Sequence, residues 1–451
     1  MQMTAREIAE ACGGVLLCGN ENTVVTSVST DSRRISAGAL FVPLKGERTD
    51  AHMYIDAVFS AGAAATLTQN DTKKLDVHPW ISVPNTEVAL QKIASAYRSR
   101  FHIPVVGITG SVGKTTTKEM VALALSSSYR VMKTEGNQNS QVGLPLTLFR
   151  LEEGDEAAVI EMGMSDFGEM SRLCSMARPK YAVMTNIGIS HIQQLKTQEN
   201  ILKEKLHITD CFGTDSILFL NGQDPFLASL REKLPHIRKV YFGTEPWCEY
   251  RAQEIESTEK GVRFRMIANG ISVCVELPVH GFHNVLNALA GLSVTHSLGG
   301  DVFAASRALS QYEPPAMRQQ IHKVRGITLI DDSYNASPDA LRSSLHVLGS
   351  FSGRKIAVLA DMLELGEFEE AAHRQVGKMA ADAGVDLLVT IGERARWIAE
   401  EAKACHIRDC VSFSENSETA SYLKEIVKEG DVLLVKGSRS MHTDEIVRAF
   451  L

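Results

Sequence analysis

A glycine-rich turn near residue 110 constrains the fold of this chain more than any other stretch. Residues 105–120 read VVGITGSVGKTTTKEM, an apolar strand, a turn and then a helix that opens at Lys114. The free N–H groups and partial positive charge of a helix N-terminus suit a polyphosphate. In the usual phosphate loop the first glycine lies five positions before the Gly-Lys pair, where this chain has Ile108. The stretch is therefore a turn that needs glycine for geometry alone or a variant nucleotide loop, and Gly-Lys-Thr-Thr directly after a strand favours the nucleotide loop.

The 451 residues are too many for one ordinary core, so we expect an α/β protein of three domains. Short strands and helices over residues 1–102 predict a small mixed α/β N-terminal domain. Near-continuous apolar strands alternate with helices over residues 103–315, which predicts a central parallel-sheet, P-loop domain. The pair Pro314-Pro315 marks a hinge. The βα rhythm of residues 316–451 predicts a Rossmann-like, doubly wound C-terminal domain.

Charge and cysteine content exclude several classes of protein. The net charge of −7 offers no basic surface for nucleic acid or an anionic membrane. The N-terminal residues lack the basic and apolar stretches of a secretion signal, and no apolar run is long enough for a membrane span. Eight cysteines include no CxxC pair, which favours reduced thiols over a zinc site or a disulfide framework. We therefore expect a cytoplasmic protein.

Polar side chains follow three predicted strands at the sheet edge where ligands of open α/β sheets collect. Lys114 would lie along the β- and γ-phosphates, and the hydroxyl of Thr115 or Thr116 would hold magnesium. Glu161 interrupts an apolar strand, and its charge needs a partner such as magnesium or a structural salt bridge. His191 lies in the loop after the next strand. Taken alone, His191 is compatible with an ordinary loop histidine, and Lys203 and Lys205 with a solvated helix face.

Eight motifs occur together in one order along nearly the whole chain. They are TGSVGKTTTKEM, TEGNQNSQVGLPLTL, EMGMSDFGEM, TNIGISH, GFHNVLNALA, DDSYNASPDAL, LADMLELG and LLVKGSRSM. In this combination the chain resembles the Mur ligase family, the ATP-dependent amide-forming enzymes of peptidoglycan precursor synthesis in cell-wall biogenesis. The nucleotide loop of that family has the form T-G-x-x-G-K-T. Gly110 thus takes the place of the glycine that is absent at Ile108.

The resemblance implies that ATP and two magnesium ions bind this chain. Asn284 would reach the adenine side of ATP, and Arg318 would close onto the phosphates. Asp332, Tyr334 and Asn335 would be the contribution of the C-terminal domain to the nucleotide site. Ser337 replaces the asparagine that is common in the family. The phosphates themselves would be wrapped by Gly110, Ser111, Val112, Gly113, Lys114, Thr115 and Thr116.

The resemblance also implies roles in metal and substrate binding. Thr115 and Glu161 would bind one magnesium ion, and His191 would serve the metal sites. Lys205 would be carbamylated by CO₂ to give a carboxylate-like ligand, although Lys203 is close by and the choice between the two lysines stays open. The catalytic set would be Lys114, Glu161, His191, Lys205 and Arg318. Contacts to the substrate would come from Ser32 and Arg33 in the N-terminal domain and from Asn139.

Within the family the chain most resembles the members that add D-alanyl-D-alanine to UDP-N-acetylmuramoyl-tripeptide through an acyl phosphate. The alternative is a ligase that adds diaminopimelate or lysine to the dipeptide precursor. Such enzymes usually carry DYAHTPD where this chain has DDSYNASPD. A folylpolyglutamate synthase would not need a UDP-binding domain like residues 1–102. We expect a monomer, while the third residue of the acceptor peptide and the D-alanyl-D-alanine contacts stay open, with KGSRSM at residues 436–441 a candidate for the latter.

Two alternatives come from other classes of protein. A GTP-binding switch should carry an N-K-x-D guanine motif after a strand, and this sequence has none. A non-catalytic scaffold would require Lys114, Glu161 and His191 all to be accidental. The sequence therefore predicts an enzyme.

Overall fold

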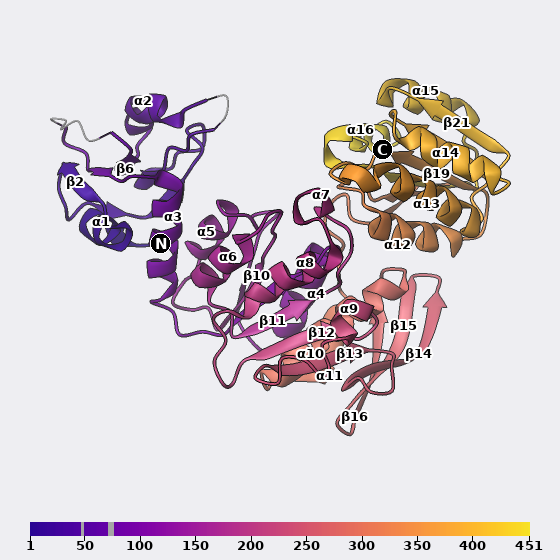
Figure 1. Cartoon of the computed structure of the whole chain (residues 1–451), viewed down its shortest axis with the longest axis horizontal. Helices are drawn as coiled ribbons and strands as arrows, with labels where there is room; N and C mark the ends of the chain where they lie inside the picture. The colour runs from indigo at the N-terminus through magenta and orange to yellow at the C-terminus, as the bar shows by residue number, and fades with distance from the viewer. Residues whose placement is uncertain (47–48, 71–75) are drawn as a thin grey trace.

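The computed structural model describes residues 1–46, 49–70 and 76–451. Figure 1 shows an N-terminal lobe, a central lobe and a C-terminal lobe that follow one another along the chain. Sheets of residues 3–82, 105–277 and 320–436 form the three lobes, in agreement with the predicted α/β class. The boundaries at residues 102 and 315 lie between these sheets and stay predictions. Among the described residues no helix is long and apolar enough to cross a bilayer.

The N-terminal lobe is a mixed α/β unit. Its five-stranded sheet has the order β2-β7-β6-β5-β4, in which only the β2–β7 pair is antiparallel, and β1 pairs with β3 in a second small sheet. Thr4 and Glu7 form a capping box that starts the first helix. The elements are β1 Met3–Thr4, α1 Ala5–Cys12, β2 Val15–Cys18, β3 Val24–Val25, β4 Ser27–Ser29, β5 Ala39–Phe41, η1 Ala51–Tyr54, α2 Ile55–Ser60, β6 Ala65–Thr68, β7 Trp80–Ser82 and α3 Thr86–Arg98.

The helix α3 leads from the N-terminal lobe into the central lobe (Figure 1). Near its end the buried guanidinium of Arg98 donates to the carbonyl oxygens of Phe101, Ile103 and Ala177. Three accepting carbonyls satisfy a charge that would otherwise be costly to bury. Arg98 therefore holds the exit of α3 against the central lobe.

The central lobe is built on a nine-stranded sheet of order β16-β15-β14-β13-β12-β11-β8-β10-β9. The strands from β9 to β14 are parallel, as predicted, and β15 and β16 extend the sheet as antiparallel strands that the sequence analysis did not identify. The strands are β8 Val105–Thr109, β9 Val131–Lys133, β10 Ala157–Glu161, β11 Tyr181–Met184, β12 Ile217–Asn221, β13 Arg238–Gly243, β14 Tyr250–Thr258, β15 Gly261–Ala268 and β16 Ile271–Leu277. The helices are α4 Lys114–Leu125, α5 Gly143–Leu148, α6 Glu169–Ala177, α7 Ile192–Leu195, α8 Gln198–Leu206, η2 His207–Thr209, α9 Pro225–Ala228, α10 Phe282–Ser297 and α11 Val302–Leu309.

Both faces of this sheet are buried, which explains why its strands are apolar throughout. Val106 and Ile108 of β8 pack into a core with α4 and α10, whereas Val105 belongs to the core on the opposite face. Successive side chains of a strand point to opposite faces, so a strand covered on both sides has few polar positions. Polar side chains therefore gather at the strand ends, where β8 and β10 run into Gly110 and Glu161.

The C-terminal lobe is a doubly wound domain, as predicted. Its sheet has the order β17-β18-β22-β19-β20-β21, parallel except for β17, and separate apolar cores cover its two faces. The elements are β17 Gln320–Val324, β18 Ile327–Asp331, α12 Pro338–Gly349, β19 Lys355–Ala360, η3 Gly366–Phe368, α13 Glu369–Asp382, β20 Leu387–Ile391, α14 Ala395–Ala404, β21 Asp409–Phe413, α15 Asn416–Ile426, β22 Val432–Lys436, η4 Arg439–Met441 and α16 Asp444–Arg448.

Candidate active site

The loop between β8 and α4 forms an open cradle at the carboxyl edge of the central sheet. Backbone N–H groups of Ser111 and Val112 donate to the backbone and side-chain oxygens of Asn186, at 3.0 and 2.9 Å. An added Cβ at Gly110 would lie 1.9 Å from Thr185 Oγ1, so only glycine fits there. Gly113 has a left-handed backbone (φ 82°) and is the N-cap of α4. The turn is thus held by Thr185 and Asn186, which directly follow β11, and the N-terminus of α4 faces the cavity.

Lys114 lies folded over this loop. Its Nζ donates to the carbonyl oxygens of Gly110 at 2.8 Å and Ser111 at 3.1 Å. Burial lowers the pKa of Lys114, an effect that the carboxylate of Glu161 opposes and Arg318 reinforces. Within the described part of the chain this half-buried ammonium has no ion-pair partner, and a phosphate group in the cradle would supply one.

Glu161 ends β10 beside the loop, and its carboxylate is only half satisfied. Oε1 accepts from Asn139 Nδ2 at 2.7 Å and from Thr115 Oγ1 at 3.2 Å. Oε2 is buried and has no hydrogen-bond partner among the residues that the structure describes. The side chain is 1% exposed, so an uncompensated oxygen there is costly. Asn139, predicted as a substrate contact, lies against Glu161 in this structure.

The two lysines of α8 differ in burial and in their contacts. Lys205 is 2% exposed and donates to the carbonyl oxygen of Gly110 at 3.1 Å, whereas Lys203 faces solvent. The carboxylate of the neighbouring Glu204 accepts a hydrogen bond from the backbone N–H of Met170. Burial and the charge of Lys114 hold the pKa of Lys205 well below its ordinary value. Of the two lysines, only Lys205 lies at the phosphate loop.

His191 caps the short helix α7 and lines the same cavity. Its Nδ1 lies 3.0 Å from Glu364 Oε2 of the C-terminal lobe, but it is buried and is not aligned as a hydrogen bond. Burial, reinforced by the nearby charge of Lys114, lowers the pKa of His191. A neutral imidazole at the cavity wall can accept a hydrogen bond or bind a metal.

Arg318 lies at the predicted hinge, with its guanidinium 3.7 Å above the ring centre of Tyr334. Its neighbours Met317 and Gln319 have left-handed backbones (φ 61° and 53°). Gln319 Oε1 lies 2.9 Å from Nε2 of His283, which is in α10 of the central lobe. The sharp backbone path of residues 317–319 thus directs Arg318 into the cavity.

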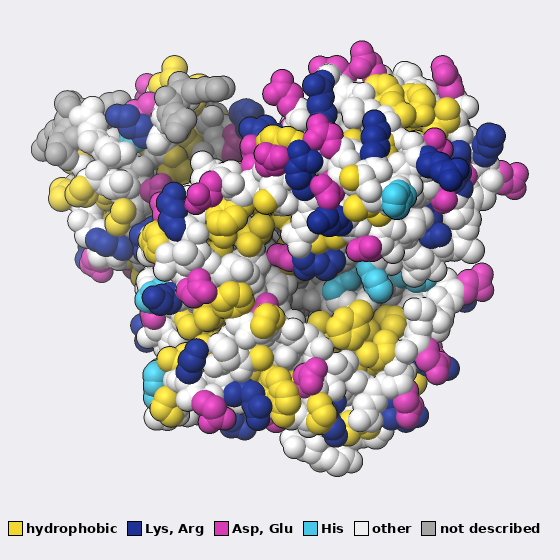
Figure 2. All heavy atoms as spheres, turned by 45° about the vertical axis from the view of Figure 1, so that its right-hand side comes forward, with side chains coloured by type: hydrophobic (Ala, Val, Ile, Leu, Met, Phe, Trp, Pro, Cys, Tyr) yellow, Lys and Arg dark blue, Asp and Glu magenta, His cyan; other side chains and the backbone are white. Residues whose placement is uncertain are grey.

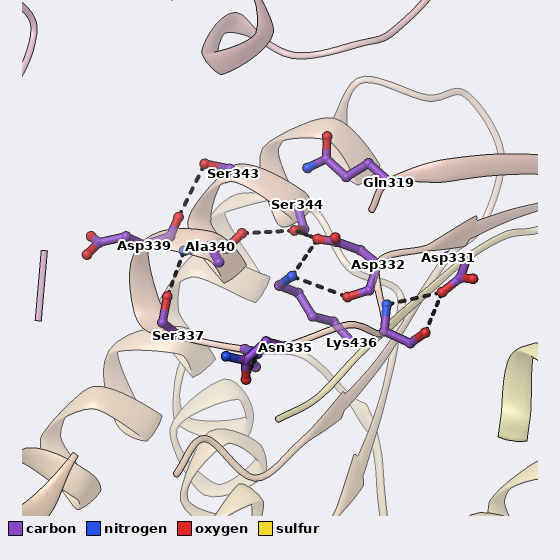
Figure 3. A network of polar contacts seen from close by, with 12 residues as sticks. Gln319, Asp331, Asp332, Asn335, Ser337, Asp339, Ala340, Ser343, Ser344 and Lys436 are labelled. Atoms are coloured by element: carbon purple, nitrogen blue, oxygen red, sulfur yellow. Dashed lines mark hydrogen bonds and ion pairs between the residues drawn. The ribbon is translucent and has the colours of Figure 1, made fainter. Parts of the chain in front are cut away.

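Asp332 belongs to a buried polar network (Figure 3). Its Oδ2 lies 2.5 Å from Lys436 Nζ and accepts from Ser344 Oγ at the same distance. Burial lowers the pKa of Lys436, and Asp332 opposes that shift. Ser337, in the place of the family asparagine, caps α12 through the N–H of Ala340 at 3.4 Å. Lys436 lines the cavity, and the sequence analysis named it only within the KGSRSM motif, as a candidate for the D-alanyl-D-alanine contacts.

The asparagines of α10 form a chain that ends at the helix after the phosphate loop. Asn284 Nδ2 donates to the carbonyl of His280, and Asn287 Nδ2 donates to Asn284 Oδ1 at 3.1 Å. Thr117 Oγ1 in turn donates to Asn287 Oδ1 at 2.8 Å. The sequence analysis did not identify Asn287. Its signal was the spacing of three residues from Asn284, which places both side chains on one face of a helix.

A cavity of about 1090 Å³ joins these groups. Figure 2 shows the surface hollowed between the C-terminal and central lobes, with histidine side chains beside the hollow. Gly110 and Lys205 lie beneath the cavity wall, and the predicted contacts Ser32 and Arg33 are not part of its lining. The predicted residues that do line it are Ser111, Val112, Gly113, Lys114, Thr115, Thr116, Asn139, Glu161, His191, Asn284, Arg318, Asp332, Tyr334 and Asn335.

The donor set suits magnesium that is shared with a phosphate. Throughout the described ranges, no group of three or more His, Cys, Asp or Glu side chains could hold a metal unaided. Magnesium in phosphate-transferring sites commonly uses one or two carboxylates and takes its other ligands from water and substrate phosphates. The free Oε2 of Glu161 beside the hydroxyl of Thr115 meets that requirement.

Family models match almost the whole length of the chain. The Mur ligase family catalytic domain matches residues 24–98, the Mur ligase middle domain matches residues 108–295, and the Mur ligase glutamate ligase domain matches residues 317–439. This chain belongs to the Mur ligase family. The identification confirms the resemblance that the eight motifs carried and places the cavity where the middle and C-terminal Mur ligase domains meet.

Individual Mur ligases are similar over their full length. The UDP-N-acetylmuramoyl-tripeptide–D-alanyl-D-alanine ligase of Bacillus subtilis strain 168 is 37% identical, over 99% of this chain and 98% of the relative. A crystal structure of MurF from Acinetobacter baumannii superposes with a TM-score of 0.92 and 27% identity over 100% of this chain and 99% of that one. MurF ligase from Thermotoga maritima in complex with ADP superposes with a TM-score of 0.85 and 30% identity, over 94% of this chain and 97% of that one.

Proposed function

We propose that this chain is an ATP-dependent amide ligase that joins D-alanyl-D-alanine to UDP-N-acetylmuramoyl-tripeptide. The observation that carries the proposal is the convergence of the phosphate loop, Glu161 and the C-terminal KGSRSM segment on one cavity. The relatives that match over the whole chain bear the name of this activity. The product would be the UDP-N-acetylmuramoyl-pentapeptide.

The nucleotide would bind across two lobes. The N-terminus of α4 and the ammonium of Lys114 suit the phosphates, because both offer positive charge at the cavity. Asn284 reaches the cavity from the central lobe, and Tyr334 and Asn335 reach it from the C-terminal lobe. ATP as the nucleotide is supported by the ADP complex of the Thermotoga maritima relative.

The reaction would proceed through an acyl phosphate. A carboxylate oxygen of the tripeptide attacks the γ-phosphorus of ATP, and ADP leaves. The amine of D-alanyl-D-alanine then attacks the acyl carbon, and phosphate leaves as the amide forms. Lys114 and Arg318 would stabilise the charge on the transferred phosphoryl group, which is the main demand of such a transfer. Closure of the C-terminal lobe would exclude water from the reactive acyl phosphate.

Two magnesium ions would complete the site. Thr115 and Glu161 would hold one, and His191 with a carbamylated Lys205 would serve the other. Bound magnesium would neutralise phosphate charge and help to keep the phosphoryl group in line. Carbamylation adds CO₂ to the Lys205 amine with loss of a proton, and it would turn a buried cation into an anionic ligand. The buried position of Lys205 at the carbonyl of Gly110 supports this assignment over Lys203.

The three lobes would divide the substrates among them. We assign residues 1–102 to the UDP-sugar, residues 103–315 to ATP and residues 316–451 to closure and the dipeptide. Ser32 and Arg33 follow β4 in the N-terminal lobe, and the side chain of Arg33 is 86% exposed and paired with Asp31. That exposure leaves Arg33 available to a diphosphate. We further propose that the enzyme acts as a cytoplasmic monomer on small-molecule substrates.

The deciding experiment is phosphate release from ATP with magnesium and UDP-N-acetylmuramoyl-tripeptide, with and without D-alanyl-D-alanine. The proposal expects release that requires both substrates and a mass gain of one dipeptide on the sugar nucleotide. If release instead requires UDP-N-acetylmuramoyl-dipeptide and free diaminopimelate or lysine, the chain catalyses the preceding ligation, which adds that amino acid. The absence of amide product with every acceptor would overturn the ligase assignment.

A further inference from the structure

One contact ties the wall of the cavity to the C-terminal lobe. His191 of the central lobe places Nδ1 3.0 Å from Oε2 of Glu364, which follows β19 in the C-terminal lobe. At this distance the two groups form an ion pair if the imidazole is protonated, yet Nδ1 has no hydrogen-bond partner among the described residues.

Both residues have an uncommon backbone conformation. His191 has φ 61° and Glu364 has φ 64°, in the left-handed region that residues other than glycine seldom occupy. Such conformations cost free energy and persist where the surrounding structure holds them, often at functional sites. The two left-handed turns present the imidazole and the carboxylate to each other across the boundary between the lobes.

The loop that carries Glu364 is held from three sides within the C-terminal lobe. The N–H of Leu363 donates to Ser438 Oγ of the KGSRSM segment at 3.0 Å. The N–H of Met362 donates to Nε2 of the buried His373 at 3.0 Å. Asp361 accepts from the N–H of Ala395 at 2.7 Å. These hydrogen bonds fix the loop within the C-terminal lobe, so Glu364 would move together with that lobe.

The same loop fits closely against α7. A Cβ added at Gly366 would lie 3.2 Å from Gln193 Cγ, which is tighter than ordinary contact. Ile189, two residues before His191, packs against the apolar core of the C-terminal lobe. The two surfaces are thus complementary around the contact between His191 and Glu364, as expected for a docking position of the lobes.

We propose that Glu364 is a positioning residue for His191. When the C-terminal lobe docks, the Glu364 carboxylate accepts the Nδ1–H of His191, which fixes the tautomer and leaves the lone pair on Nε2. A histidine oriented in this way by a carboxylate is the usual arrangement of a metal-binding imidazole. The inference rests on the proposed function. Under this proposal, Nε2 of His191 is free to bind magnesium or to contact a bound phosphate only when the C-terminal lobe is docked.

The competing interpretation is a surface ion pair without a role. The side chain of Glu364 is 60% exposed, and exposed pairs often contribute little to stability. A readout of His191 itself separates the two interpretations, since a surface pair would leave the tautomer unchanged when the carboxylate is removed.

The test is NMR of histidine side chains labelled with ¹⁵N and with ¹³C at Cε1, on the full chain with magnesium and a non-hydrolysable ATP analogue. A His191→Gln variant assigns the signal. We expect the Nδ1–H tautomer in the unsubstituted protein and in Glu364→Gln, whose amide oxygen still accepts. We expect Nε2–H or a mixture in Glu364→Ala. Glu367→Ala, an exposed neighbour in η3, is the matched control and should retain the Nδ1–H tautomer.

Kinetics supply the second readout. Glu364→Ala should raise the magnesium concentration needed for half-maximal turnover 10- to 100-fold, the usual effect of losing such a partner. Glu364→Gln should recover part of this loss, and the KM for D-alanyl-D-alanine should stay the same. An unchanged His191 tautomer and magnesium requirement in Glu364→Ala would overturn the inference. An unsubstituted protein that forms no amide would contradict the proposed function instead, since the tautomer measurement needs no turnover.

Discussion

Lys114 and Lys205 donate hydrogen bonds to the same oxygen atom, the backbone carbonyl of Gly110, at 2.8 and 3.1 Å. One lysine begins the helix of the phosphate loop, and the other comes from α8 on the far side of that loop. Two ammonium groups on one carbonyl repel each other in a buried setting, and the pKa values of both are lowered, chiefly by burial. Carbamylation of Lys205 would replace this repulsion with attraction.

Replacing Lys205 by Ala should reduce ligation about 10³-fold or more, since the site would lose an anionic ligand of the proposed second magnesium ion, whose charge would stabilise the transferred phosphoryl group. Lys203→Ala is the matched control, because Lys203 is exposed on the same helix and should retain nearly full activity. The measurement is the steady-state formation of the amide product, repeated with added short-chain carboxylic acids. Recovery of the Lys205→Ala variant by these acids would support the carbamate. Equal activities of the two lysine variants would contradict the assignment.

Replacing Arg318 by Ala should slow turnover by about 10²-fold or more while the affinity for the UDP-sugar substrate stays within twofold. Arg318 lines the cavity above Tyr334, and the UDP-sugar is assigned to a different lobe. Turnover is checked by phosphate release and affinity by isothermal calorimetry. Arg318→Lys keeps the positive charge without the planar stacking group, so it should recover part of the rate. An unchanged rate in Arg318→Ala would rule out a role in phosphoryl transfer.

Breaking the buried pair of Asp332 and Lys436 should cost stability. Lys436→Met leaves the Asp332 carboxylate buried with only Ser344 as its partner, a loss of about 3–5 kcal/mol in the free energy of unfolding. The double variant Asp332→Asn with Lys436→Met should lose less than the sum of the two single variants. Urea unfolding followed by circular dichroism tests this, with Arg263→Met of the exposed pair with Glu256 as a control that should change little. Strictly additive losses would show that the pair is not coupled.

Gly110→Ala should abolish the thermal stabilisation that ATP gives. The added methyl group would meet Thr185 Oγ1, whose hydroxyl donates to the carbonyl of Val112 at 2.6 Å, and the loop would have to move. A ligand that binds the folded state raises the melting temperature by an amount that grows with the logarithm of the ratio of ligand concentration to Kd. A distorted cradle that no longer binds ATP should therefore show no shift. Differential scanning fluorimetry with and without magnesium-ATP is the measurement. Gly384→Ala, at a left-handed position with open space around it, controls for backbone strain. This variant should keep the rise in melting temperature that magnesium-ATP gives.

The fold class could be predicted from the sequence because its signals are local. Apolar runs such as those of β8 and β11 indicate strands buried on both faces, and turn chemistry places Gly113 and Lys114 at a helix start. The antiparallel strands β15 and β16 were not identified. Their side chains alternate between buried and exposed, a weaker signal than the continuous apolar runs before them.

The sequence by itself determined the phosphate loop, the three-part α/β organisation and the family, since motif spacing and hydrophobic period are properties of short stretches. Only the tertiary structure decided which residues meet. It buries Lys205 rather than Lys203, pairs Asp332 with Lys436 across 104 positions, and brings Glu364 to His191. The physical reason is that these contacts depend on how separate elements pack, and no local pattern records which distant side chain will share a buried position.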